Sequence, residues 1–220
     1  MCIFKPKPLF EVICNKLVPL YQNAFSVNLS HYDIRNDPKD AYAPITRRSK
    51  NEIVLNCNMS CACQIAFQLS HELCHAAIPN DVNNNLRWFE ETLAVLSSYF
   101  FPMQLFCVDS KKYSAYFCFA YQELSPLCKT DPMVLDNETL LFLQSGSGTS
   151  NYNDYGSYRE VAEKILPTVK QSPDFWKCVP CMCNVPSGLS FFDSIEEWKS
   201  LAPSDVSNVI SVVISALLLR

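Results

Sequence analysis

The sequence predicts an α+β protein in which a small N-terminal mixed sheet and one helix precede a mostly helical remainder. Three short runs before residue 58 have the composition and alternation of strands. After residue 60, apolar residues recur at helical spacing instead. The chain has 220 residues, of which 49% are hydrophobic and 18% charged, so it can bury a large core. We therefore predict a single domain over 1–220, with a sheet-and-helix lobe at about 1–79 and a helical lobe at about 80–220.

Composition and charge argue against several classes of protein. The net charge is −4 and no run of lysine and arginine exceeds a pair, so no nucleic-acid partner is expected. A membrane partner is not expected either, because no stretch approaches the roughly 18 apolar residues of a spanning helix. The apolar run after Lys7 is interrupted by Glu11, Asn15 and Lys16, unlike a secretory signal. The twelve cysteines are therefore expected to stay reduced, which favours a cytoplasmic protein.

The first predicted elements are one helix and three strands. A helix is expected over 9–21, where apolar residues follow helical spacing and Pro19 limits the far end. Alternating apolar residues predict a strand at 25–29, and a second short strand is expected at 41–45. A third strand is expected over 52–57, directly before the next helix, and we predict that it forms the edge of the sheet.

Helices are predicted for most of the remaining chain. The first of them carries an apolar stripe formed by Ile65, Leu69 and Leu73, and it ends at Pro79. The next is expected to end before Pro102. The predicted helical segments beyond residue 80 cover about 86–99, 106–127, 135–144, 155–169, 194–201 and the chain after Ser204.

The most specific chemical signal is the run His71-Glu72-Leu73-Cys74-His75. Histidines four residues apart on a helix point the same way, so their imidazoles can share one metal ion. Glu72 then lies beside that metal, where it can deprotonate a water molecule. This is the HExxH pattern of zinc metalloproteases, with His71 and His75 as ligands and Glu72 as general base.

A catalytic zinc ion normally has three protein ligands, so one more ligand is required. The segment Trp88-Phe89-Glu90-Glu91-Thr92-Leu93-Ala94 could supply it from the next helix, where the small Ala94 permits close approach. Glu90 and Glu91 are about 100° apart around that helix, so both cannot face the same ion. Asp81, six residues after His75, is the other candidate. Glu90 is otherwise expected to be an exposed helical carboxylate.

These residues resemble those of the gluzincin metallopeptidases, in which HExxH is followed by a glutamate on a neighbouring helix. The segment around Glu91 is similar to that of aminopeptidases, and with Pro102-Met103 it also resembles ImmA/IrrE-type metallopeptidases. Asp81 matches a metzincin-like ligand position, but the turn glycine of metzincins is Ile78 here. The resemblance covers about residues 50–103. It implies a zincin-like fold, bound Zn²⁺, and Glu91 as the third ligand.

The resemblance further implies a hydrolase that cleaves a peptide or protein substrate, with Glu72 activating the water at the zinc ion. A second donor would stabilise the oxyanion. Three tyrosines, Tyr152, Tyr155 and Tyr158, cluster near the start of a predicted helix, and we select Tyr155. His31 is expected to be an ordinary surface or core histidine.

Two other functions are compatible with the same residues. One is a non-catalytic metal-binding or structural protein that retains the fold, and the other is a regulatory protease specific for one protein partner. The predicted strand over 52–57 would pair with an extended substrate, by resemblance to zincins.

The cluster of Cys178, Cys181 and Cys183 offers three of the four ligands that a structural zinc site needs. We expect these residues to be unpaired thiols or a redox-labile pair rather than a second metal site. Cys74, inside the HExxH run, is expected to be a small packing residue.

Overall fold

The fold is built from α-helices of 11 to 23 residues, two 3-10 helices and one short sheet within the described residues. The computed structural model describes residues 8–109 and 155–218. In chain order the elements are α1 (Leu9–Phe25), β1 (Asp33–Asn36), β2 (Ile45–Arg47), η1 (Arg48–Lys50), β3 (Glu52–Leu55), α2 (Ala62–Ala77), α3 (Arg87–Asp109), α6 (Tyr155–Gln171), η3 (Pro173–Asn184), α7 (Phe191–Leu201) and α8 (Ser207–Leu218). The predicted combination of a small sheet and a mostly helical body is confirmed.

The sheet has three strands in the order β1-β3-β2 and is mixed, as predicted. β1 runs parallel to β3, and β2 runs antiparallel to β3. The prediction that the third strand lies at the edge was wrong, because β3 pairs on both sides and β2 forms an edge instead. The reason is visible in the residues of β3: Ile53, Val54 and Leu55 are all fully buried, as in a strand covered on both faces.

The N-terminal helix is longer than predicted and replaces the strand expected at 25–29. Ile13, Leu17, Tyr21 and Phe25 follow one another at intervals of four, and all are buried. This helical stripe prevails over the short alternation that begins at Phe25. Ser26 adopts a left-handed conformation with φ of 56° and ends the helix. The first strand forms only at Asp33, and the second is shifted from 41–45 to Ile45–Arg47.

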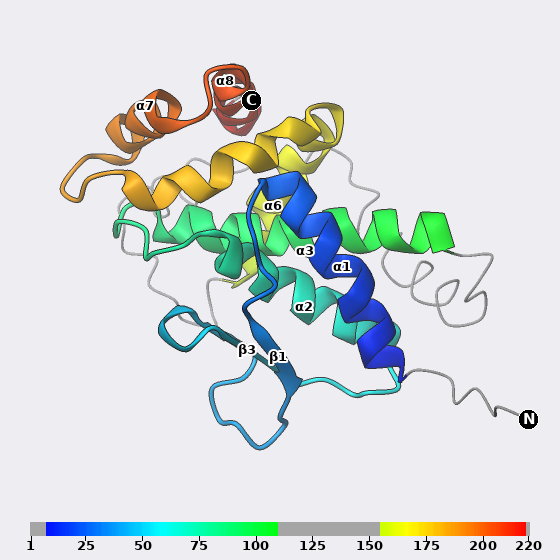
Figure 1. Ribbon diagram of the computed structural model, residues 1–220. Coiled ribbons are helices and arrows are strands. Elements are labelled where there is room, and N and C mark those ends of the chain that lie inside the picture. The colour runs from blue at the N-terminus through cyan, green and yellow to red at the C-terminus, as the bar shows by residue number, and fades with distance from the viewer. Residues whose placement is uncertain (1–7, 110–154, 219–220) are drawn as a thin grey trace, which may run out of the picture.

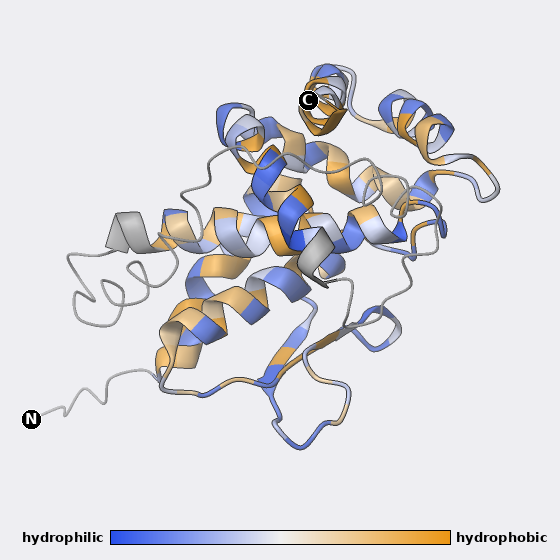
Figure 2. Ribbon diagram, turned by 180° about the vertical axis from the view of Figure 1, so that it is seen from behind, coloured by the Kyte–Doolittle hydropathy of each residue, from blue (hydrophilic) through white to orange (hydrophobic). Residues whose placement is uncertain are grey.

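The hydrophobic core lies between the helices and includes residues from α1 through α8. Figure 1 shows the sheet at one end, α2 and α3 in the middle, and α7 and α8 at the other end. α2 packs against both α1 and α3. Its predicted apolar stripe is confirmed, since Ile65, Leu69 and Leu73 are fully buried. Hydrophobic and hydrophilic residues are interspersed along the helices (Figure 2), and on α2 the side chains of His71 and His75 are only partly exposed.

α3 does not end before Pro102 as predicted but continues to Asp109. Buried Phe101 and Leu105 flank the proline, and their packing offsets the hydrogen bond that Pro102 cannot donate. The predicted helix near 155–169 is confirmed as α6, and the last two as α7 and α8. Residues 106–109 of the segment predicted at 106–127 form the end of α3; the rest of it, and all of the segment predicted at 135–144, lie outside the described residues. Among the described helices, none combines the length and apolarity required to cross a bilayer.

Candidate metal centre

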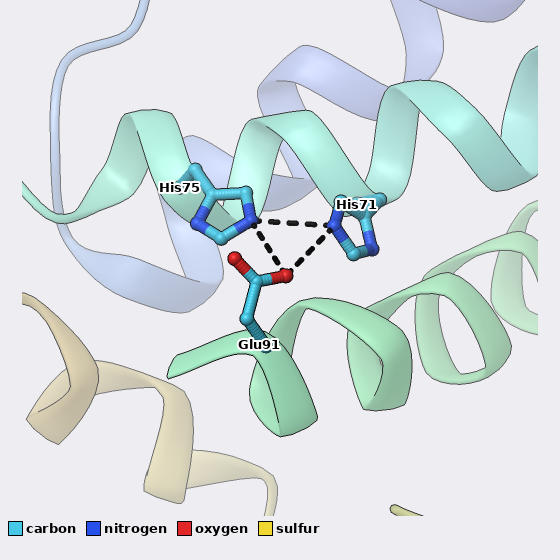
Figure 3. Close-up of side chains that lie close together, drawn as sticks. All are labelled: His71, His75 and Glu91. Carbon is cyan, nitrogen blue, oxygen red and sulfur yellow. Dashed lines mark hydrogen bonds and ion pairs between the residues drawn. The ribbon is translucent and has the colours of Figure 1, made fainter. Parts of the chain in front are cut away.

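The centre of the site is a pair of histidines one turn apart on α2. The Nε2 atoms of His71 and His75 lie 3.3 Å apart. Both side chains are mostly buried, on the face of α2 that turns toward α3 (Figure 3). The helical spacing in the sequence therefore brings the two imidazoles together as predicted.

Glu91 reaches the two histidines from α3. Its Oε2 atom lies 3.5 Å from Nε2 of His71 and 3.6 Å from Nε2 of His75, so the three ligand atoms form a triangle (Figure 3). A hydrogen bond of 2.9 Å from Ser97 Oγ to the main-chain oxygen of Ser70 also joins the two helices. The residues that could hold a metal ion together in the described part of the chain are His71, His75 and Glu91.

The spacing within this triangle fits a tetrahedral metal ion. Zinc bound to nitrogen and carboxylate oxygen at about 2.0–2.2 Å places neighbouring ligand atoms about 3.3–3.5 Å apart. The observed separations of 3.3, 3.5 and 3.6 Å match that requirement closely. Three protein ligands leave a fourth position for water or substrate, as in catalytic rather than structural zinc sites.

Glu90 is a partner of His75 and not an exposed carboxylate, which corrects the expectation from sequence. Only 5% of its surface is exposed, and its Oε1 atom lies 2.8 Å from Nδ1 of His75. Glu90 can accept the Nδ1 proton and so direct the Nε2 lone pair of His75 to the metal position. Adjacent carboxylates on α3 therefore serve different nitrogens of the same imidazole.

Arg48, at the start of η1, holds this arrangement together. Its Nη2 atom contacts Oε1 of Glu90, while Nε donates to the main-chain oxygens of His75 and Ile78 at 3.1 and 2.8 Å. These are carbonyls at the C-terminal end of α2, where the helix leaves oxygens without internal partners. Arg48 thus caps the helix that carries both histidines and also fixes the carboxylate behind one of them.

Asp81, the other candidate ligand, lies outside the triangle. Its side chain is 80% exposed and forms a 2.9 Å ion pair with Nη1 of Arg48. Ile78, which stands where metzincins have a glycine, instead ends α2 in an extended conformation. The geometry therefore favours Glu91 over both Glu90 and Asp81 as the third member of the cluster.

The charges in the triangle reinforce one another. Burial would lower the pKa of His75, but the carboxylates of Glu91 and Glu90 outweigh it and raise that pKa well above its usual range. Burial would raise the pKa of Glu91, whereas His75 and His71 bring it well below its usual range. In the metal-free protein, both pKa shifts therefore favour a protonated His75 beside an ionised Glu91.

Metal affinity is consequently expected to rise with pH through and beyond neutrality. A metal ion must displace the proton on Nε2 of His75, so affinity should rise by about tenfold per pH unit until the raised pKa is passed. With an unperturbed histidine the rise would level off above about pH 6.5. Competition with a chromophoric zinc chelator between about pH 6 and pH 8 would measure this slope.

The matched variant for this measurement is Glu90→Gln, which removes one of the two carboxylates that raise the pKa of His75. The zinc affinity of this variant should reach its plateau at a lower pH than the zinc affinity of the wild type. A wild-type affinity that is already constant above about pH 6.5 would contradict the prediction.

Replacement of Arg48 by glutamine is expected to weaken zinc binding by about 10- to 100-fold, the usual effect of losing an outer-shell partner. The reason is that Glu90 loses the guanidinium that holds it, and the end of α2 loses its cap. Arg48→Lys keeps the charge and should show a smaller loss. Arg35→Gln serves as control, because it removes an arginine of strand β1 that pairs with Asp37 instead. Unchanged zinc affinity in a folded Arg48→Gln protein would refute this role.

Glu72 is buried in the same cleft as the two histidines, and its exposed fraction is 3%. The hydroxyl of Thr46 lies 2.8 Å from both Oε2 and the main-chain oxygen of Glu72. Because a hydroxyl has one proton, Thr46 donates to one of these oxygens at a time. The contact ties the candidate base directly to strand β2.

A cleft of about 740 Å³ contains the site. Its walls come from the 41–46 segment, from the ends of α2 and α3, and from Tyr158 on α6. Tyr155, selected from the sequence, begins α6, but its side chain lies outside the described residues, as does all of Tyr152. His31 is exposed, its ring contacts that of Tyr32 at a tilt, and it does not line the cleft, in line with an ordinary histidine.

The other residues around the candidate site gave no signal in the sequence. Thr46 and Arg48 contact Glu72 and Glu90 across 26 and 42 positions of chain. Tyr158 was one of three tyrosines considered, and only the fold distinguishes it.

The cysteine cluster does not join a metal site within the described part of the chain. Cys178, Cys181 and Cys183 are on η3 and form no disulfide. Burial raises the pKa of Cys178 to about 12, which keeps the thiol neutral and disfavours metal binding. Cys74 is fully buried, as expected of a packing residue, and burial raises its pKa as well.

Comparison with protein-family models, with curated proteins and with solved structures finds no match to this chain. The possible metal site therefore rests on the geometry of the cluster alone.

Proposed function

We propose that this protein is a zinc-dependent peptidase with a zincin-like arrangement of its sheet and site helices. The observation that supports this most directly is the combination of the His71-His75-Glu91 triangle with Glu72 in one cleft. A cluster that only bound metal would need the outer carboxylate of Glu90 but not a further buried, hydrogen-bonded carboxylate in the same cleft. The carboxylate of Glu72 is such a group.

The ligand atoms favour zinc among the common metals. Two imidazole nitrogens and one carboxylate oxygen are a set that zinc accepts in hydrolytic sites, whereas magnesium and calcium prefer oxygen ligands. The buried Glu90 behind His75 completes the carboxylate–histidine pattern that accompanies many zinc ligands. When bound, zinc would supply an acidified water and polarise the carbonyl of the scissile bond.

The chain itself would perform the proton transfers. Glu72 would accept a proton from the attacking water and pass it to the nitrogen of the departing amine. Thr46 would hold the carboxylate through the contact at Oε2. Tyr158, whose side chain lines the cleft, is our candidate for donating a hydrogen bond to the oxygen that becomes negative. Tyr158 is proposed in place of Tyr155 because it lines the cleft that contains the metal triangle.

The substrate would be an extended peptide lying along β2. In the described part of the chain β2 pairs only with β3, so its other edge can accept a further strand. Ile45 and Thr46 of this strand line the cleft. Backbone pairing along β2 would bring a peptide bond beside both the metal position and Glu72.

Metal depletion tests the proposal. The full-length protein is incubated with a peptide library made by digesting a whole proteome, and new peptide ends are identified by mass spectrometry. We expect cleavage that disappears after removal of zinc by a chelator and returns when one equivalent is restored. One zinc ion per chain without any cleavage of peptides or of intact proteins would favour a non-catalytic metal-binding protein instead.

A further inference from the structure

Arg87 has a special position beside the proposed active site. It is the first residue of α3 and precedes the candidate ligand Glu91 by one helical turn. It lines the cleft that contains the metal site, and it also lines a neighbouring pocket of about 400 Å³. Asp81 is the other residue common to both linings. The two hollows therefore adjoin one another, with Arg87 at the junction.

The two arginines of the cleft differ in how their charge is used. Arg48 is engaged by Glu90, by Asp81 and by two main-chain oxygens. Within the described residues, no carboxylate forms an ion pair with Arg87, and its side chain is exposed to solvent in the cleft. Asp81, Glu90 and Glu91 also line the cleft, and each is paired with Arg48 or with the histidines. Arg87 is thus a cation available to a ligand.

The neighbouring pocket is lined mostly by uncharged residues, and hydrogen bonds between two loops hold its walls in place. The amide of Asn83 donates to Pro186 O at 3.0 Å, and the amide of Asn85 donates to Leu189 O. These bonds fasten the loop before α7 to the loop before α3. Gly188, with φ of 88°, allows the turn that forms part of the wall. Asp81 is the one acidic residue in the lining, so Arg87 provides the attraction for an anion.

We propose that Arg87 binds a carboxylate of the substrate in this pocket, an inference that rests on the proposed peptidase function. A guanidinium binds carboxylates through two parallel hydrogen bonds, which gives both affinity and orientation. Four residues of helix separate Arg87 from Glu91, a rise of about 6 Å. The substrate carboxylate would therefore lie within about two residues of the bond that is cleaved.

Two groups in a peptide carry this chemistry: the C-terminal carboxylate and the side chain of Asp or Glu. Three hydroxamate peptides with the same zinc-binding head distinguish them. One has neutral side chains and a free C-terminus, the second has a glutamate and an amidated C-terminus, and the third has a glutamine and an amidated C-terminus. Their binding to the zinc-loaded full-length protein is measured by isothermal titration calorimetry.

At least one of the two anionic peptides is expected to bind about 10- to 100-fold more tightly than the neutral peptide. Which one does so identifies the source of the carboxylate. Arg87→Gln should abolish the preference without changing affinity for the neutral peptide, and Arg87→Lys should retain part of it. Lys50→Gln, which removes an exposed cation that does not line the cleft, should leave the preference intact.

Equal binding of all three peptides to the wild type would overturn the role of Arg87 and leave the peptidase proposal standing. A preference that survives in Arg87→Gln would do the same. Failure of the wild type to bind zinc, or of the zinc-loaded protein to bind even the neutral hydroxamate, would overturn the peptidase proposal and this inference with it.

Discussion

Replacement of Glu72 by glutamine is expected to lower kcat for peptide cleavage by about a hundredfold to ten-thousandfold, while zinc content per chain remains that of the wild type. Glutamine has the same shape and can still accept a hydrogen bond from Thr46, but it cannot take a proton from water. Glu72 is not a member of the metal-binding triangle, so the metal should stay. The measurement combines kcat on a cleaved library peptide with elemental analysis of the same sample.

A second glutamate provides the control for this experiment. Glu196 is also on a helix, α7, but its side chain is 71% exposed and pairs with Lys199 at the surface. Glu196→Gln should therefore leave kcat unchanged. Full activity in Glu72→Gln would refute the general-base assignment, whereas loss of zinc together with activity would show that Glu72 acts in metal binding instead.

Replacement of Glu91 by glutamine should reduce zinc affinity by more than the 10- to 100-fold that is typical of outer-shell residues, because a direct ligand is lost. The amide has nearly the same volume, so packing between α2 and α3 is retained. Asp81→Asn removes a carboxylate from the same cleft without touching the triangle and should leave one zinc ion per chain. Elemental analysis and chelator competition would measure both variants.

His75→Ala extends the comparison to the other helix. It should lose zinc at least as completely as Glu91→Gln, because it removes a ligand and leaves Glu90 buried without that partner. Loss of zinc in Asp81→Asn with retention in Glu91→Gln would instead place the third ligand at Asp81. Circular dichroism on each variant separates loss of metal from loss of fold.

The ligand triangle could be predicted from sequence because its geometry is mostly local. Helical spacing alone brings His71 and His75 together, and a short loop makes α3 a neighbour of α2. Once the helices pack, Glu91 and Glu90 must point in different directions. Glu91 could therefore be selected as the candidate ligand from sequence. The burial of Glu90 behind His75 could not be predicted, since it depends on where Arg48 lies.

The errors fall where distant parts of the chain meet. Strand order within a sheet is set by pairing between segments, so the central place of β3 could not be read from its position before α2. The extension of α1 to Phe25 depends on the packing of Tyr21 and Phe25 against Phe101. Phe101 belongs to α3 and is far from both residues in the sequence. Local alternation at 25–29 carried no information about that contact.

The contacts of the Thr46 hydroxyl bear on where a substrate peptide would lie relative to Glu72. Thr46 belongs to the strand that would pair with the peptide, and it also touches the carboxylate and main chain of Glu72. The distance between the paired backbone and the base is therefore set by one short link of the protein itself. Backbone pairing with β2 would therefore set which peptide bond is cleaved. The side chains of the peptide would mainly affect its affinity.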